Sequence, residues 1–589
     1  MTAAPAAERG SRSPWTVLAV LCLGLFMILL DGTIVNIAIP KIMIAFSTTL
    51  SNVEWVMNAY VLSFAVTLIT LGRFGDLYGR KRLFWTGMAL FTASSVACGL
   101  APGIYWLIGF RALQGLGGAA MMPATLSIVA AVFPAGRRGA AMGIWGGVSG
   151  LATAIGPTLG GLIVDAASWR WIFLVNLPIG VASLVLASVY VPESKNPEAV
   201  ETLDLPGVAL VTAGLFCLTF ALVEGQKLGW TSATIVALFA TSAIGLVLFY
   251  FRERRVRQPL IDFSLFRSRN FLFGNITGFA LSFGMMGVFF MVPIFLQTVL
   301  GFSAIKAGLA MSPMSVAIIF AAPLAGRLSD RFGSAWLVAG GMFLTALGIA
   351  WMAGLTPLQQ GLRPDTALSD LVAPFVVAGV GIGCAIAPLT SAVMATAPRD
   401  RIGNASGVLS TMRQVGSVMG IAVLGAVLQN RLEHNVAAGV DAGLPAAPAA
   451  AREQITAALI RMGTHSRPSI AAMKDLSARM AEQMAAGMAG MPAALREAAL
   501  KAVGEFMAQS PTLFKVWFTD AINTTFVVGV AVCVLGGVTA LFLRSHVGDA
   551  GEASADESEV GTETAAATDA VNDDPAPASP KRTSASSSA

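Results

Sequence analysis

The chain has 589 residues, of which 55% are hydrophobic and only 12% are charged, and its formal net charge is +5. Soluble proteins carry about 25% charged residues, so this composition excludes a water-soluble globular protein and predicts an integral membrane protein. The sequence has no Gly-Lys pair and hence no phosphate-binding loop, which excludes a pump with its own ATPase site. The five cysteines lie in apolar stretches without a C-x-x-C pair, and the three histidines are scattered, so we expect no disulfide framework and no metal site.

Fourteen segments are long and apolar enough to cross a bilayer, for which a helix needs about 20 residues. In chain order these expected spans are 15–38, 53–71, 84–100, 104–133, 140–164, 171–191, 207–224, 231–250, 272–299, 308–326, 335–355, 371–397, 404–428 and 516–543. The first apolar run is too long for the core of a signal peptide, so we expect an uncleaved span.

The distribution of Lys and Arg predicts the orientation of these spans. With the N-terminus in the cytoplasm, the cytoplasmic segments hold 22 Lys and Arg and the short outside loops hold five. Because positive residues favour the cytoplasmic side, we expect a multi-pass protein of the inner or plasma membrane with both termini, residues 1–14 and 544–589, in the cytoplasm. The second of these segments has a composition typical of disorder.

Residues 429–515 are expected to form one long loop outside the membrane. Its pieces "SIAAMKDLSARMAEQMAAGM" and "PAALREAALKAVGEFMAQ" have the apolar spacing of amphipathic helices. Such helices could lie on the membrane surface, cap the outer opening or bind an extracytoplasmic partner. An insertion without a function of its own is the alternative.

Three pairs of short segments repeat along the chain at offsets of 254, 265 and 264 residues. They are "GRFGDLYGRKR" and "GRLSDRFG", "LGGAAMMPATLS" and "GIGCAIAPLTSA", and "RRGAAMG" and "RIGNASG". The repeats predict two parallel six-helix halves, residues 15–191 and 272–543. Residues 192–271 would add two inserted helices with flanking cytoplasmic loops. Two such halves around a central cavity suit alternating access.

Asp31 lies near the middle of the first span, where a carboxylate is costly and by default marks an ion or substrate pathway. Arg111 in the fourth span needs a counter-ion, because its guanidinium is always charged, and Asp31 is the candidate. Gln114 lies one helical turn from Arg111 on the same face. A pairing that changes with protonation would couple protons to conformation, and a static buried ion pair is the alternative.

Several motifs resemble those of the major facilitator superfamily, and in particular its fourteen-helix drug:proton antiporter branch. The superfamily motifs are "GRFGDLYGRKR", "RALQGLGGA" and "GPTLGG", and those of the branch are "LDGTIVNIAIP", "EWVMNAYVLS" and "WRWIFLVNLP". The resemblance covers most of residues 15–430 and 516–543. It implies an all-α integral membrane protein with 14 transmembrane helices that exports hydrophobic drugs, antibiotics or natural products in exchange for protons. It also implies that Asp31 and Arg111 couple transport to protons.

The stretch containing Gly156, Pro157, Gly160 and Gly161 lies in the fifth span. Small residues let helices approach closely, and a proline kinks a helix, so tight membrane packing alone would explain it. The resemblance implies an antiporter motif that is characteristic of exporters rather than importers.

Gly72, Asp76, Gly79 and Arg80 form the cytoplasmic turn after the second span, and Asp330 occupies the matching place in the second half. Glycines permit the tight turn, and Asp76 could accept hydrogen bonds from a helix N-terminus. We expect these residues to form a cytoplasmic gate. The role of Asp330 should be weaker, because no basic run follows it.

Five residues are candidates for the substrate cavity, namely Gln114 in the fourth span and Arg413, Gln414, Asp520 and Asn523 in the late spans. Relatives that export dications often carry extra carboxylates in these spans, whereas this chain has an arginine at residue 413. The difference argues against a purely dicationic substrate. It leaves room for neutral, zwitterionic or weakly acidic aromatic molecules.

The expected partners are a small hydrophobic or amphipathic organic substrate, protons and the lipid bilayer, with no nucleic acid, no cofactor and a monomeric state. The proton gradient would supply the energy, and no enzymatic activity is expected. Alternatives are a proton-coupled importer of a small nutrient and an exporter of an endogenous lipid or siderophore. A membrane-embedded enzyme would need a paired His/Asp/Glu cluster at one membrane face, which the sequence lacks.

Overall fold

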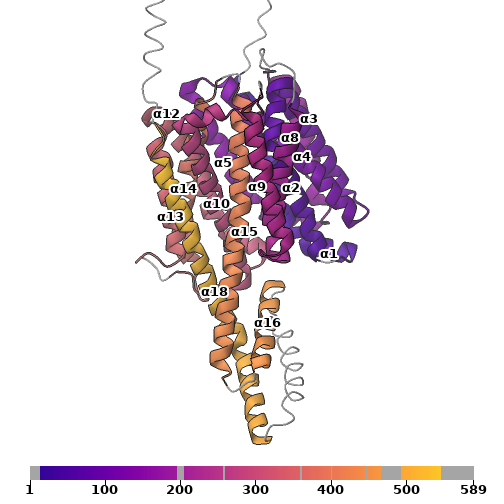
Figure 1. Ribbon diagram of the computed structural model, residues 1–589, viewed down its shortest axis with the longest axis vertical. Coiled ribbons are helices and arrows are strands. Elements are labelled where there is room, and N and C mark those ends of the chain that lie inside the picture. Colours follow the sequence, from indigo (N-terminus) through magenta and orange to yellow (C-terminus); the bar gives the residue numbers. More distant parts are fainter. Residues whose placement is uncertain are drawn as a thin grey trace, which may run out of the picture. The chain divides into compact units, whose positions relative to one another are not determined.

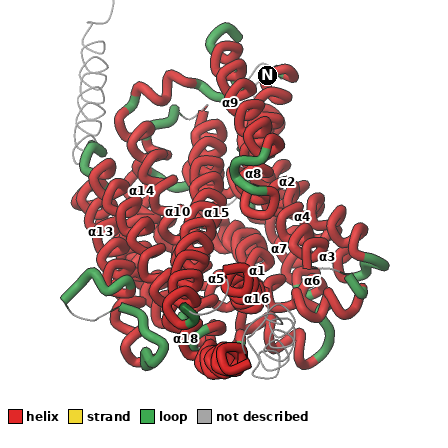
Figure 2. The backbone as a smooth tube through the Cα atoms, turned by 60° about the horizontal axis from the view of Figure 1, so that its bottom comes forward, coloured by secondary structure: helices red, strands yellow, loops and turns green. Residues whose placement is uncertain are grey.

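The computed structural model describes residues 13–48, 50–194, 204–256, 259–357, 361–398, 401–445, 449–465 and 493–544. Within these ranges all regular secondary structure is helical (Figures 1 and 2). All of the first amphipathic piece expected in the outside loop, and nearly all of the C-terminal tail, lie outside the described residues.

The helices fall into three groups along the chain. The N half contains α1 (Pro14–Phe46), α2 (Leu50–Tyr78), α3 (Arg80–Gly99), α4 (Ile104–Val132), α5 (Ala135–Ala166), α6 (Trp171–Leu174) and α7 (Asn176–Tyr190). The inserted pair is α8 (Leu205–Leu228) and α9 (Ala233–Glu253). The 3-10 helix η1 (Phe263–Arg267) precedes the C half, which contains α10 (Arg269–Thr298), α11 (Ala304–Ala310), α12 (Ser312–Phe332), α13 (Ala335–Met352), α14 (Leu368–Ala395), α15 (Ile402–Gly443), α16 (Ala449–His465) and α18 (Ala493–Ala540).

Twelve of the described helices, α6 and α7 counting as one, are long and apolar enough to cross a membrane. The segments of the other two expected spans are helical, as α3 and α5 of 20 and 32 residues, but their sequences are less apolar and neither is among these twelve. Both are rich in small and weakly polar residues, which suit close helix packing better than contact with lipid.

Local sequence signals explain several of the helix starts. Proline occupies the first turn of α1, α8 and α12, where its missing N–H costs no hydrogen bond. Ser232 caps α9 by accepting a hydrogen bond from the Ile235 amide, and Ser303 caps α11 by accepting one from the Lys306 amide. Gly79 separates α2 from α3 with a φ of 110°, a conformation that favours glycine.

The two halves repeat one set of helix neighbours. In the N half, α1 contacts α5 and α7, α4 contacts α2 and α3, and α3 contacts α7. In the C half, α10 contacts α15 and α18, α14 contacts α12 and α13, and α13 contacts α18 in the same way. The contacts between the halves repeat as well, because α5 packs on α12 and α14 just as α15 packs on α2 and α4.

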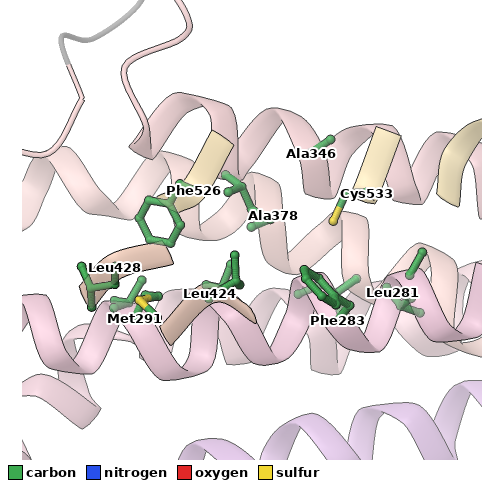
Figure 3. Packing of buried hydrophobic residues seen from close by; sticks show 14 of the residues in the cluster. Leu281, Phe283, Met291, Ala346, Ala378, Leu424, Leu428, Phe526 and Cys533 are labelled. Atoms are coloured by element: carbon green, nitrogen blue, oxygen red, sulfur yellow. The ribbon is translucent and has the colours of Figure 1, made fainter. Parts of the chain in front are cut away.

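Apolar side chains fill the interior of each half. Figure 3 shows part of the C-half core, to which α10 contributes Phe283, α15 Leu424, and α18 Phe526 and Cys533. The inserted pair packs on itself, and α8 also contacts both α2 and α15. The ion pair between Asp204 and Arg252, with donor–acceptor distances of 2.6–3.0 Å, holds the start of α8 to the end of α9.

Two C-half helices continue well beyond the expected span boundaries at residues 428 and 516. Helix α15 has 42 residues and α18 has 48, which correspond to about 63 and 72 Å at about 1.5 Å per residue, whereas a bilayer core is about 30 Å thick. Their extensions lie beside α16 in Figure 1 and share an apolar core that includes Leu432, Val436, Leu459 and Phe506. The segment expected to be a loop is therefore in part a helical continuation of the bundle.

Candidate functional site

Asp31 on α1 lies at the centre of a buried polar cluster inside the N half. Its carboxylate forms an ion pair with Arg111 of α4. It also accepts hydrogen bonds from Gln114 Nε2 at 2.9 Å and from Asn176 Nδ2 of α7 at 3.3 Å. The side chain of Asp31 is 0% exposed and that of Arg111 is 1% exposed. The pairing expected from the sequence is therefore present, and it is fully desolvated.

Arg111 is held on several sides. Its Nε donates to the Val56 carbonyl of α2 at 3.1 Å, and its Nη1 donates to Gln114 Oε1 at 2.8 Å. Its guanidinium carbon lies 4.3 Å from the centroid of the Tyr60 ring and 5.8 Å from that of Phe173. An arginine can stack on aromatic rings and donate from its edge at the same time, which a lysine cannot. The position is specific for arginine.

Asn176 links this ion pair to a second set of hydrogen bonds. Its Nδ2 also donates to Ser95 Oγ of α3 at 3.0 Å, and Ser95 donates to the Phe173 carbonyl at 2.9 Å. Asn176 is the first residue of α7, directly after the short α6. The break between the two helices places its amide against Asp31.

The cluster draws its side chains and carbonyls from α1, α2, α3, α4, α6 and α7, all in the N half. Removing one partner of a buried ion pair costs about 3–5 kcal/mol, because the other charge stays buried without compensation. In the described state each charge of the pair is compensated by the other, so loss of either one would leave its partner buried without a counter-ion.

The glycines of the expected antiporter motif bring α5 against the segment of α1 that carries Asp31. A Cβ atom at Gly156 would collide with Thr33, and one at Gly160 would lie 2.8 Å from Ile34 Cγ1. A Cβ atom at Gly161 would lie 2.5 Å from Ile305 Cγ1 of α11 in the C half. The stretch therefore packs on both halves. The side chain of Pro157 lies outside the described residues.

A second polar site joins the end of α2 to the start of α15. Asp76 is 0% exposed and accepts hydrogen bonds from the amides of Gly403 at 3.1 Å and Asn404 at 3.0 Å. These amides belong to the first turn of α15, where backbone donors have no acceptor within the helix and the helix dipole favours a negative charge. Arg80 completes the site with an ion pair to Asp76 at 2.9 Å.

Asp330 makes the matching contact between the end of α12 and the start of α5. It accepts hydrogen bonds from the amides of Gly139 at 3.0 Å and Ala140 at 3.2 Å. Asp330 is exposed, and no ion pair to it is present among the described residues. The two acids thus differ in their surroundings, with Asp76 buried and paired and Asp330 in contact with solvent.

The contact between α2 and α15 and the contact between α12 and α5 both depend on glycines that allow the backbones to touch. A Cβ atom at Gly72 would lie 2.9 Å from the Gly403 oxygen and 3.2 Å from Gly407 Cα. A Cβ atom at Gly326 would collide with the Gly139 oxygen and lie 3.2 Å from Gly143 Cα. The segments that repeat along the sequence therefore meet crosswise, each acid motif of one half contacting the helix start of the other. Gly79 lies outside these crossings, against the carboxylate of Glu193.

Of the five candidate cavity residues, Gln114 belongs to the Asp31 cluster, and the other four separate into two pairs. Arg413 and Gln414 are half-buried in the first third of α15, where the guanidinium carbon of Arg413 lies 5.7 Å from the centroid of the Trp145 ring on α5. Asp520 instead is exposed and accepts a hydrogen bond from Asn435 Nδ2 at 3.0 Å. Asn523 exchanges hydrogen bonds with the backbone of Leu362.

The expectation that Asp520 and Asn523 face the substrate is therefore not supported. Asp520 joins α18 to the extension of α15, and Asn523 holds the segment between α13 and α14. Their place near the outer start of the last span accounts for both contacts, because polar side chains at a span end can bond to loops and neighbouring helix ends.

The sequence alone did not identify Tyr60, Ser95 and Asn176 as parts of the Asp31 cluster. Tyr60 and Asn176 lie inside the motifs "EWVMNAYVLS" and "WRWIFLVNLP", so a signal was present. Their uncharged side chains gave no physical reason to single them out. Ser95 lies in a stretch of small residues and carries no such signal.

Comparisons with known proteins give one consistent family. The sequence profile of the Major Facilitator Superfamily matches residues 21–421. The "Multidrug resistance protein Stp" of Mycobacterium tuberculosis is 37% identical over 424 residues, which are 72% of this chain and 77% of that protein. The "Tetracenomycin C resistance and export protein" of Streptomyces glaucescens is 34% identical over 419 residues, which are 71% and 77% of the two chains.

A solved structure supports the fold. The proton:xylose symporter XylE bound to 6-bromo-6-deoxy-D-glucose has a TM-score of 0.51 and 14% identity, and the match covers 69% of this chain and 87% of that one. At this identity the likeness concerns the fold alone.

Proposed function

The chain belongs to the Major Facilitator Superfamily of transporters, and on this premise we propose that it is a proton-driven exporter of hydrophobic drugs, antibiotics or natural products. It would cross the plasma membrane fourteen times, with α3 and α5 completing the twelve more apolar spans, and both termini would lie in the cytoplasm. The energy would come from the proton gradient without a cofactor, at about 2.3 kcal/mol per charge for each 100 mV of potential.

The direction of transport is supported by the relatives. One is named for multidrug resistance and another for resistance to and export of tetracenomycin C. The close contact of Gly156 and Gly160 with α1 supports the same direction, because this stretch resembles a motif of exporters. We therefore favour export over import of a nutrient.

The single observation that carries the proposal is the desolvated ion pair of Asp31 and Arg111 beside the α1–α5 contact. A carboxylate that is ionised in one state and protonated in another can link proton movement to a change of shape. Protonation would release Arg111 from Asp31 and loosen the packing of α1 in the N half. The resulting rearrangement would favour the state that is open to the cytoplasm.

The described contacts of Asp76 and Asp330 would then close the cytoplasmic side in the opposite state. Both acids bond the start of a helix in the other half, so both contacts must break when the halves swing apart at this end. Alternating access by such a motion is the general mechanism of transporters built from two repeated halves.

Transport in vesicles tests the proposal. Purified protein in proteoliposomes should move ethidium, or an antibiotic to which cells producing the protein become resistant, against its gradient when a pH difference is imposed. Collapse of the pH difference should stop the movement. Uphill transport by an Asp31→Asn variant under the same pH difference would show that the coupling assignment is wrong.

A further inference from the structure

Arg413 is a cation without a counter-ion in the middle of the bundle. It lies 11 residues into α15 from Ile402, which at about 1.5 Å per residue is about half of the bilayer core. No carboxylate of the described residues pairs with it. The sequence explains this, because α10, α14 and residues 135–164 of α5 contain no Asp or Glu within their apolar parts.

The charge balance of the interior makes this arginine unusual. Asp31 and Arg111, which are fully buried, neutralise each other. The half-buried Arg413 therefore leaves one net positive charge in the middle of the spans that the structure describes. Buried charges in proteins are generally paired, and a cation within a membrane span by default marks a pathway for a substrate or an ion.

The surroundings of Arg413 combine aromatic surface with unused hydrogen-bond donors. Its aliphatic stem packs near Gly278 of α10, and its guanidinium lies over the ring of Trp145 from the opposite half. Trp145 is 1% exposed, yet its Nε1 has no acceptor among the described residues. The hydroxyl of Ser410, one turn before Arg413, is likewise buried without a partner in the described part of the chain.

These observations together specify a ligand. A guanidinium presents several N–H donors in a plane that matches a carboxylate or sulfonate, and the indole offers a flat apolar surface with one further donor. We propose that Arg413 and Trp145 form a binding subsite for the acidic group of an aromatic organic anion. This inference rests on the proposed export function and names the class of substrate that it would favour.

A matched pair of fluorescent probes separates charge from hydrophobicity. Anilinonaphthalene sulfonate and phenylnaphthylamine share one aromatic skeleton and differ in the sulfonate group. Each is titrated against the purified full-length protein in detergent, without a pH difference. We expect the wild-type protein to bind the sulfonate at least about tenfold more tightly, because a hydrogen bond to a charged group contributes about 1.5–3 kcal/mol.

Variants then assign this preference to the subsite. Arg413→Gln should remove the preference by weakening binding of the sulfonate about tenfold, while binding of phenylnaphthylamine changes less than about threefold. Arg413→Lys should give an intermediate result, because it keeps the charge and loses the planar fork. Trp145→Phe keeps a ring and removes the N–H, and should weaken the sulfonate about threefold. Arg431→Gln is the control, because Arg431 is an exposed arginine of the same helix.

Two results would overturn the proposal. The first is a wild-type protein without preference for the sulfonate, or a preference that survives Arg413→Gln. The second is displacement of the sulfonate from the wild-type protein by chloride in place of gluconate, since the site would then hold a small inorganic anion.

Transport is measured separately so that the two proposals can fail independently. If the sulfonate binds in a way that depends on Arg413 but is not moved by a pH difference, the exporter proposal is wrong and the subsite proposal stands. If a pH difference drives transport and Arg413→Gln leaves the charge selectivity unchanged, the subsite proposal is wrong and the exporter proposal stands.

Discussion

At the scale of single residues, the ion pair of Asp31 and Arg111 joins function to stability. Each partner is buried, so neither charge can be compensated by water if the other is lost. The same pair that would couple protons to transport therefore holds α1 against α4. A substitution here affects both properties, and an experiment must separate them.

We expect Asp31→Asn to abolish uphill transport and to lower the stability of the purified protein by about 3–5 kcal/mol, because Arg111 is left as an unpaired buried cation. The double variant Asp31→Asn with Arg111→Gln removes both charges and should recover most of this stability without recovering transport. Thermal unfolding in detergent and vesicle transport measure the two effects. A single variant as stable as the wild type, or a double variant that transports uphill, would contradict this view.

Charged residues of the cluster could be identified from the sequence, whereas its neutral members could not. A carboxylate and a guanidinium in apolar spans are costly and therefore conspicuous. The neutral side chains of Asn176 and Tyr60 are not costly in an apolar span and are therefore not conspicuous. The contact of Asn176 with Asp31 depends on the helix break after α6, and the contact of Tyr60 depends on its stacking against Arg111. Those contacts are tertiary, and in the sequence only the position of Tyr60 and Asn176 inside recognisable motifs marked the two residues.

At the scale of helices, the contacts of Asp76 and Asp330 are alike in geometry and unequal in burial. Asp76 bonds amides in the first turn of α15 in a dry environment, where a hydrogen bond to a charge is strong. Asp330 bonds amides in the second turn of α5 and is exposed to water. The end of the bundle should therefore be held mainly by the first contact.

We expect Asp76→Ala to open this end of the bundle far more than Asp330→Ala, because only the first leaves buried amides without an acceptor. Spin labels at Arg137 and Arg327, both exposed and on opposite halves, report the separation in a chain whose native cysteines have been replaced. Equal distance distributions for the two variants would show that burial does not decide the strength of the contact.

Gly326 should be as important as Asp76 for holding this end of the bundle together, because a Cβ atom at residue 326 would collide with the backbone of Gly139. Gly326→Ala is expected to shift the same spin-label distances toward the open form. Gly340→Ala in α13 is the matched control, since a Cβ atom at Gly340 meets nothing within 4 Å. Equal spin-label distances in the Gly326→Ala and Gly340→Ala variants would show that close packing between α12 and α5 does not hold this end of the bundle closed.

The sequence predicts where helices lie better than where they end. Apolar length located the twelve apolar spans and the helices α3 and α5, because hydrophobicity is a local property. The extensions of α15 and α18 past residues 428 and 516 are polar enough to resemble a loop. They are helical because each buries an apolar stripe, including Leu432 and Phe506, against the other, and this pairing depends on contacts between distant segments.

At the scale of the whole bundle, the repeated sequence motifs account for the repeated contacts. The offset of 254 residues separates both Asp76 from Asp330 and Gly72 from Gly326, and the offset of 264 separates Gly139 from Gly403. Each motif meets the helix start of the other half. The sequence thus predicted the two halves, but the crosswise pairing between them required the structure.

The inserted helices α8 and α9 add contacts to the α2–α15 side of the bundle and so make the two related contacts between the halves unequal. Helix α8 contacts α2 and α15, and the segment after α9 is bound to the start of α15 through an ion pair between Asp262 and Arg401. The side-chain Nδ2 of Asn404 also donates to the Leu260 carbonyl at 2.5 Å. The side formed by α2 and α15 is therefore joined to the inserted pair.

We expect Asp262→Arg to weaken this attachment, because it places two cations together, and to broaden the spin-label distances at the gate. The exchanged double variant, Asp262→Arg with Arg401→Asp, should restore part of the original distribution. The restoration is partial because Arg401 has further electrostatic interactions. A distance distribution as broad in the double variant as in the single one would show that the ion pair does not hold the segment after α9 to α15.

The complete burial of Asp31 also bears on what the protein does while idle. A titratable acid open to water on both faces of a membrane would carry hydrogen ions down their gradient with no cargo moving. Here the acid is enclosed by neighbouring side chains, so under the proposed coupling the described state should not leak protons. A cell could then keep many copies in its membrane without dissipating the proton gradient that is proposed to drive them.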